Sequence, residues 1–462
     1  MRFWAPPAIA TVLIVATLLL VASLIRTSIP PLRRLGIPDS MVAGFAGLVL
    51  GTWATAALQQ GEGADVSPLV GLFALDIGTL ELIVYQGLAV IFIAVGLQEP
   101  VKTKGGSGAR SVAFAMPMFA AIQAIVGLGI AAALALHPGF GSLLPLGFQQ
   151  GPGQALSLGE AWESTGLVDG GQVGLIIAAA GFAWAVFVGV PLVAIGRKMG
   201  WTSTTQGDSS TDEAPEPHAT SEPGGLEPLT QQAAIVAAVL LATWGVVSFA
   251  SGVLPEKMGP MAYGFHFIVG LGLAMLTRTV LKKLGKQQAV LNDRLLGRIG
   301  GAAVDAVTCC ALAAVQVAVL ADNLLPIVLI TGIGGVVTVL GLLWLAKRAW
   351  RDAPFEHAMV VFGALTGTLP TGLALLRMID PDLRGPAASS AVVGSAAAAP
   401  LIAPLVIAVL PMPISAWPET GGTFIAIGIC AAYVVALAVA WRLFGGLRFL
   451  RPLPSLWPRD AD

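Results

Sequence analysis

Charge is the property that this sequence has least of. Only 11% of its 462 residues are Asp, Glu, Lys or Arg, about half the share found in an ordinary soluble domain. Lys and Arg number 25 and Asp and Glu number 26, so there is no basic excess that would attract nucleic acid. Because 56% of the residues are hydrophobic, the composition excludes a soluble domain and predicts an integral membrane protein surrounded by the lipid bilayer.

Cysteine and the motifs of catalysis are also scarce. The three cysteines, Cys309, Cys310 and Cys430, lie in apolar runs without the spacing of a disulfide framework or a metal site. His266 and His357 are far apart in the sequence, and there is no nucleophile elbow and no phosphate-binding loop. We therefore expect neither an enzyme nor an ATP-driven pump, and neither a metal centre nor an organic cofactor.

Long runs without charge, in contrast, are abundant. A helix that crosses a bilayer needs about 20 mostly apolar residues, because unsatisfied backbone groups in hydrocarbon are costly. We expect the first run to be a retained helix, since it lacks the charged start and the cleavage site of a signal peptide. Eleven predicted crossings lie at 7–25, 41–61, 82–98, 111–136, 170–196, 228–255, 258–277, 306–321, 323–346, 385–412 and 420–441.

The cations fall on one side of this predicted topology. If the N-terminus is outside, only Arg2 and Lys257 are external, and 22 of the 25 Lys and Arg residues are cytoplasmic once Arg377 is also set apart. Short loops rich in Lys and Arg stay in the cytoplasm. We therefore expect an outside N-terminus and a cytoplasmic C-terminus.

Two apolar segments do not fit the alternation as crossings. Residues 143–162 and 357–376 are interrupted by Gly, Pro, Gln and Thr. Broken backbone is tolerated at membrane depth only where protein or a watery cavity satisfies it. We interpret both segments as re-entrant hairpins, the first starting from outside and the second from the cytoplasm.

The two halves of the chain repeat each other. Met41 pairs with Met261, Gln98 with Gln316 and Gly147 with Gly363, at offsets of 220, 218 and 216. Each half has five crossings, an odd number, so the second half is inverted relative to the first. The predicted fold is an all-α polytopic membrane protein with a first inverted repeat at 1–200, a disordered acidic cytoplasmic linker at 201–230, a second inverted repeat at 231–413, and an extra transmembrane helix with a cytoplasmic tail at 420–462.

The residues of both hairpins resemble those of the bacterial sodium:glutamate symporter family. Thr368-Leu-Pro370-Thr371-Gly is similar to the A-T-P-T-A element of the family's second hairpin, and Gly159-Glu-Ala-Trp162 is similar to its G-A-A-W. The first tip departs from the family's G-G-H-G-T-G and has no His. The resemblance implies inverted repeats, an elevator movement of a hairpin-bearing domain, uptake of an acidic amino acid coupled to Na⁺, a homodimer, and a location in a bacterial cytoplasmic membrane.

The hairpin tips are the predicted substrate site. Half-helix N-termini can bind a carboxylate, freed carbonyls can coordinate Na⁺, and glycines allow close backbone approach. The alternative is that these small residues only pack helices together, as small residues do throughout membranes. The candidate residues at the tips are Gln149, Gln150, Gly151, Gly153, Gln154, Thr366, Gly367, Thr368, Pro370 and Thr371.

Four further polar residues interrupt apolar sequence. Arg377 either binds a substrate carboxylate or pairs with Asp380 or Asp382 at the cytoplasmic mouth. Asp305 either binds the coupling ion or pairs with Arg298. Gln98 and Gln316 are coupling-ion candidates as repeat mates, although such residues also serve as hydrogen-bond partners between helices.

The predicted function is secondary active transport of glutamate, another amino acid or a small organic anion, with Na⁺ as the coupling ion. Two alternatives stay open. In the first alternative, the protein is an H⁺-coupled carrier that uses Asp305. In the second, it is a sensor or channel-like protein that has kept the fold without coupling.

Overall fold

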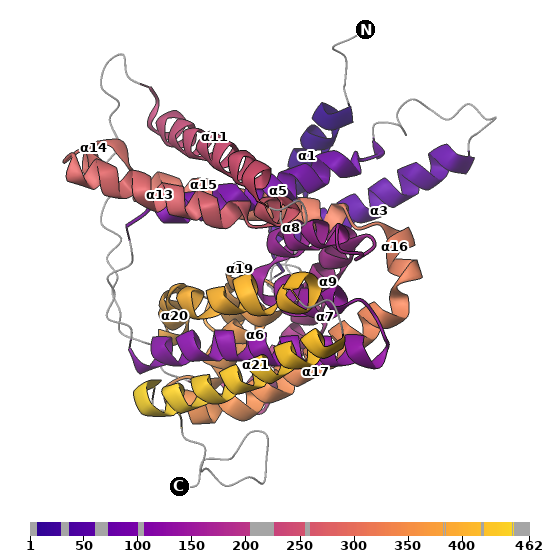
Figure 1. Ribbon diagram of the computed structural model, residues 1–462. Helices are drawn as coiled ribbons and strands as arrows, with labels where there is room; N and C mark the ends of the chain where they lie inside the picture. The colour runs from indigo at the N-terminus through magenta and orange to yellow at the C-terminus, as the bar shows by residue number, and fades with distance from the viewer. Residues whose placement is uncertain are drawn as a thin grey trace.

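The computed structural model describes residues 7–28, 37–60, 73–99, 106–203, 226–254, 259–381, 383, 385–416, 420–445 and 447, and every element in this part of the chain is helical (Figure 1). Ten of the helices are long and apolar enough to cross a membrane. The predicted all-helical polytopic membrane protein is therefore confirmed. Most of the predicted linker and most of the predicted C-terminal tail lie outside the described residues.

The helices of the first half are α1 (Pro7–Ser28), α3 (Asp39–Gln60), α5 (Ile77–Leu97), α6 (Ser107–Ala133), α7 (Pro138–Pro145), the π-helical turn η1 (Leu146–Gln150), α8 (Pro152–Glu163), α9 (Gly170–Trp184), the π-helical turn η2 (Ala185–Gly189) and α10 (Val190–Lys198). Those of the second half are α11 (Pro228–Val253), α12 (Gly259–Gly264), α13 (His266–Lys283), α14 (Gln287–Val290), α15 (Asp293–Ala313), α16 (Val317–Asp322), α17 (Leu324–Ala349), α18 (Pro354–Thr366), α19 (Leu369–Arg377), α20 (Pro386–Pro404) and the π-helical turns η3 (Leu405–Val409) and η4 (Met412–Ala416). The chain ends with α21 (Thr420–Ala440) and the π-helical turn η5 (Trp441–Gly445).

Two predicted crossings differ from the helices observed. The run at 258–277 is divided between α12 and α13, and α13 carries three cations in its second half. The run at 306–321 is divided between α15 and α16. Helix α15 begins at Asp293 because the side chain of Asn292 caps it, accepting from the N–H of Leu295 at 3.1 Å. This helix continues through Asp305, an exposed residue, so the predicted crossing, which began only after this charge, starts too late.

The element boundaries support the predicted repeat. Helices α5 and α15 begin 216 residues apart, at 77 and 293, and so do α7 and α18, at 138 and 354, and α9 and α20, at 170 and 386. Asp76 and Asn292, whose side chains cap α5 and α15, have the same offset. The inverted symmetry itself stays a prediction.

Helices α6 and α17 lie antiparallel within the lower group of helices in Figure 1. The hydroxyl of Ser111, near the start of α6, donates to the carbonyl of Ala349, at the end of α17, at 3.0 Å. Further along, Gln123 Nε2 donates to Thr338 Oγ1 at 3.1 Å. The carboxyl ends of α6 and α17 therefore lie at opposite ends of the pair, and the broken helices that follow them start from opposite sides.

The helices form two bodies that each take elements from both halves. The frame body comprises α1, α3, α5 and α11 to α15, and the hairpin body comprises α6 to α10 and α17 to α21 (Figure 1). They meet where α8 packs against α5 and α12. There, Ser157 Oγ of α8 donates to the carbonyl of Gly264 at 2.9 Å, and Gln172 Nε2 of α9 donates to Glu81 Oε1 of α5 at 2.5 Å.

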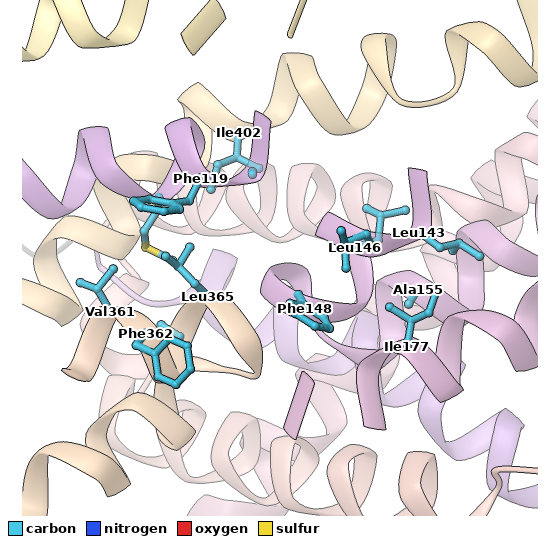
Figure 2. Packing of buried hydrophobic residues seen from close by; sticks show 14 of the residues in the cluster. Phe119, Leu143, Leu146, Phe148, Ala155, Ile177, Val361, Phe362, Leu365 and Ile402 are labelled. Carbon is cyan, nitrogen blue, oxygen red and sulfur yellow. The ribbon is translucent and has the colours of Figure 1, made fainter. Parts of the chain in front are cut away.

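The core of the hairpin body surrounds the two broken segments. Figure 2 shows Leu146 and Phe148 near Ile177 at one of them, and Phe362 and Leu365 at the other. Phe148, Phe362 and Leu365 are 0% exposed. This dense apolar packing fixes the position of both breaks in the helices. A flexible loop at the same position would lack such packing.

Candidate functional site

The first broken segment is α7, η1 and α8, and its tip is Gly151. This glycine has φ 90° and ψ 171°, a conformation that side-chain-bearing residues rarely adopt. Pro152 begins α8, where its missing N–H costs nothing because the first N–H groups of a helix have no partner within the helix. The N-terminus of α8 therefore opens at the tip, as the sequence predicted for 143–162.

The second broken segment is α18 and α19, and its tip is Gly367 and Thr368. Helix α18 ends at Thr366, and Pro370 lies in the first turn of α19. Thr368 Oγ1 and Thr371 Oγ1 are 3.2 Å apart, so their hydroxyls face each other across this first turn. The N-terminus of α19 opens at the tip, within the predicted hairpin at 357–376.

The two tips meet. A methyl group added to the Cα of Gly151 would lie 3.5 Å from Cγ2 of Thr368. Gly181 of α9 lies behind both tips, since a methyl group there would be 2.3 Å from the carbonyl oxygen of Thr366 and 3.1 Å from Phe148 Cδ1. Leu88 of the frame body covers the first tip, because a methyl group on Gly153 would be 2.9 Å from Leu88 Cβ. The candidate site is thus enclosed by both hairpins, α9 and α5.

Buried amide groups surround the tips. Gln149 is 7% exposed and Gln154 is 4% exposed. Neither heteroatom of the Gln149 amide has a hydrogen-bond partner in the described part of the chain, and neither does Gln154 Oε1. Gln154 Nε2 donates to Gln150 Oε1 at 3.5 Å. Each buried polar group left unpaired costs about 1–3 kcal/mol, so these groups are suited to a polar ligand that pairs with them.

The tips contain no charged side chain from Leu146 to Gln154 or from Gly363 to Gly372. Their electrostatics come from backbone groups: α8 and α19 present the positive ends of their dipoles, and α18 presents its negative end. Such an arrangement can bind a carboxylate at the two N-termini and a small hard cation at freed carbonyls.

The start of the first hairpin is fixed by a histidine. His137 precedes α7, and its Nδ1 accepts from the N–H of Gly139 at 3.1 Å. Burial lowers the pKa of the His137 imidazole below its ordinary value, and a hydrogen bond to the Thr165 backbone opposes this shift. Since the capping nitrogen must be unprotonated, the lowered pKa and the cap favour the same neutral form.

Arg377 and Asp305 are not at the tips. Arg377 is exposed in the last turn of α19, where a cation complements the helix dipole. The carboxylate of Asp380 accepts from the N–H of Gly385 at 2.7 Å, and Asp382 lies outside the described residues. Asp305 is exposed on α15 of the frame body. Their proposed binding roles stay predictions.

Gln98 and Gln316 are not brought together. The carbonyl of Gln98, at the end of α5, accepts from Arg278 Nη1. The N–H of Gln316 donates to Gln172 Oε1 at 3.0 Å, and Gln172 also binds Glu81, near the start of α5. At 1.5 Å per residue, Glu81 and Gln98 are about 25 Å apart along α5, so these glutamines do not share one ion site in this conformation.

Three residues at the site were missed by the sequence analysis: Gln123, Leu88 and Gly181. Gln123 had a usable signal, since it is a lone amide in an apolar run, as Gln98 and Gln316 are. Leu88 and Gly181 had none, because Leu and Gly are abundant throughout the chain.

The described residues contain no group of three or more His, Cys, Asp or Glu side chains that could hold a metal ion. All three cysteines are buried and free. The polar groups that converge on the tips are amides, hydroxyls and backbone atoms instead.

A polytopic helical membrane protein in which two broken helices meet tip to tip has the architecture of a secondary transporter. The sequence comparison agrees with this class. The chain belongs to the sodium/glutamate symporter family, whose model matches residues 7–367. This is a family of membrane transporters rather than enzymes, and the matched segment ends at the second tip. No match to the chain was found among curated proteins or among solved structures.

Proposed function

We propose that the protein is a Na⁺-coupled symporter of glutamate or a related small anionic amino acid, and that the substrate binds between the two hairpin tips. The observation that carries this proposal is the meeting of Gly151 and Thr368, with the buried and unpaired amide of Gln149 beside them. The N-termini of α8 and α19 would bind a substrate carboxylate. Gln149 and Gln154 would pair with the remaining polar groups of the substrate.

Transport would follow an elevator movement, in which the hairpin body slides past the frame body with the site enclosed. Two observations support this: each half contributes to both bodies, and few polar contacts join them, at α8 and at the start of α9. An outside N-terminus, a cytoplasmic C-terminus, a bacterial cytoplasmic membrane and a homodimeric assembly complete the proposal.

Uptake into liposomes tests the coupling. Purified protein would be reconstituted and supplied with labelled glutamate and a panel of other amino and carboxylic acids, under an imposed Na⁺ gradient, an imposed H⁺ gradient or neither. We expect accumulation of glutamate only with the inward Na⁺ gradient. Accumulation with the H⁺ gradient alone would favour the H⁺-coupled alternative, and accumulation that ignores both gradients would reject coupled transport.

Cross-linking tests the elevator movement. The native cysteines would be replaced, and Ser157→Cys in the hairpin body would be combined with His266→Cys in the frame body. These two positions can be bridged, because Ser157 Oγ and His266 Nδ1 are 3.5 Å apart. A short bifunctional thiol reagent should stop uptake in this pair. The matched pair Met116→Cys and Ser395→Cys lies within the hairpin body, where Met116 Sδ and Ser395 Oγ are 3.2 Å apart, and should continue to transport after bridging. Uptake that survives the first bridge would contradict the elevator movement.

A further inference from the structure

The amide of Gln123 has an orientation that its neighbours determine. The residue lies on α6 and is 1% exposed. Its Nε2 donates to Thr338 Oγ1 of α17 at 3.1 Å and to the carbonyl of Leu365 of α18 at 3.1 Å. The Thr338 hydroxyl donates its own proton to the carbonyl of Gly334 at 2.7 Å. Both neighbours of Nε2 are therefore acceptors, and only the NH₂ end of the amide can face them.

The other end of this amide is left with nothing to accept. Gln123 Oε1 is buried and has no hydrogen-bond partner in the part of the chain that the structure describes. Rotation of the amide cannot relieve this, because it would turn the oxygen towards two other acceptors. A buried acceptor fixed in this way is destabilising unless something positive pairs with it.

The amide group of Gln123 lies beside the carboxyl end of a half-helix. Leu365, which accepts from the same amide, is the last residue but one of α18, and Gly367 interrupts the backbone directly afterwards. The final carbonyls of a helix lack partners within the helix and form the negative end of its dipole. The Gln123 amide, with its unpaired oxygen, therefore lies at the negative end of a half-helix dipole, an arrangement that suits a small hard cation.

We propose that Gln123 Oε1 is a ligand of the coupling cation, Na⁺, at the carboxyl end of α18. The other ligands would be carbonyl oxygens of α18 and its tip. The inference rests on the proposed Na⁺-coupled transport and extends it, since it assigns the cation to a residue of α6. Binding of the cation at this position would fix the end of α18 and thereby the tip that contacts Gly151.

The test compares three variants in reconstituted uptake and in binding of NaCl alone. Gln123→Leu keeps the volume and removes the oxygen, and it should raise the Na⁺ concentration for half-maximal uptake by about tenfold or more, as loss of a single buried polar partner does. Thr338→Val keeps Oε1 and removes one anchor of the amide, so its effect on Na⁺ should be smaller. Gln232→Leu is the control, because it removes a buried glutamine of α11 that makes two hydrogen bonds far from the tips.

Substrate-free protein supplies a second readout. NaCl should raise the melting temperature of wild-type protein and Gln232→Leu more than choline chloride does, and this difference should be lost in Gln123→Leu. Wild-type uptake that depends on Na⁺, together with an unchanged Na⁺ dependence and thermal response in Gln123→Leu, would overturn the cation site alone. Wild-type uptake without any Na⁺ dependence would overturn the proposed function as well. Equal effects of Gln123→Leu and Thr338→Val would mean that Gln123 only positions the tip.

Discussion

Gly181 offers a direct test of how the second tip is packed. Replacement by alanine places a methyl group 2.3 Å from the carbonyl oxygen of Thr366, 3.1 Å from Phe148 Cδ1 and 3.3 Å from the carbonyl carbon of Thr366. Carbon and oxygen atoms normally stay at least about 3.3 Å apart. The added methyl group and the Thr366 oxygen must therefore move apart by roughly 1 Å. The atom in the way belongs to the backbone and cannot rotate aside.

The expected cost follows from two opposing effects. Overpacking in a well-packed core costs about 1–3 kcal/mol, whereas a glycine-to-alanine change inside a helix ordinarily stabilises it by roughly 0.5–1 kcal/mol. Gly129 of α6 is the matched control, because a methyl group there would have no atom within 4 Å. Both glycines lie inside helices, so this gain applies to both variants and cancels in the comparison. Gly181→Ala should therefore be less stable than Gly129→Ala by about 1–3 kcal/mol.

Equilibrium unfolding in detergent micelles measures this difference, and reconstituted uptake measures its consequence. Gly181→Ala should raise the KM for the substrate, since the tip that contains Thr368 must move, whereas Gly129→Ala should leave KM unchanged. If Gly181→Ala were as stable as Gly129→Ala and had normal KM, the close contact of α9 with the second tip would be wrong.

Two further predictions concern the first hairpin. Gly151→Ala forces a residue with a side chain into a conformation that costs about 1–3 kcal/mol, and this variant should lose uptake. Gly166→Ala is the control and should keep uptake, because Gly166 also has a positive φ but has open space around it. Equal uptake by both variants would contradict the tip site. Because the pKa of His137 is lowered in the folded protein, its contribution to stability is complete above the unfolded pKa of about 6.5 and is lost as the pH falls. The melting temperature should thus decline below that pH in wild-type protein and decline less in His137→Asn, and parallel profiles of the two proteins would refute this role.

The sequence alone predicted those features that arise from local pattern. Gly151, Pro152, Gly367 and Pro370 interrupt apolar sequence, and both breaks occur where they do. The boundaries of α15 were predicted less well, because the predicted crossing contained no charged residue, whereas Asp305 lies inside this helix and is exposed on its surface. Charge content is a guide to burial in lipid, but it does not mark where a helix begins; the capping residue Asn292 does.

Contacts between distant segments could not be predicted in this way. The meeting of Gly151 with Thr368 depends on the antiparallel packing of α6 and α17, which no single run of sequence records. Gln98 and Gln316 show that a shared sequence pattern does not imply a shared location. They share the pattern of a lone amide in an apolar run with Gln123, yet only Gln123 lies beside a tip, because the pattern identifies a buried amide and not its neighbours.

The neutrality of the tips has a physical consequence for the proposed coupling. A site that moves through the low-dielectric interior of a membrane is costly to move when it carries net charge. With only amides, hydroxyls and backbone dipoles at its tips, the empty site is neutral. A bound anion alone would make it negative, and a cation bound at the carboxyl end of α18 would offset that charge. Movement is then least costly for the empty site and for the site loaded with both ligands, which is the condition for symport.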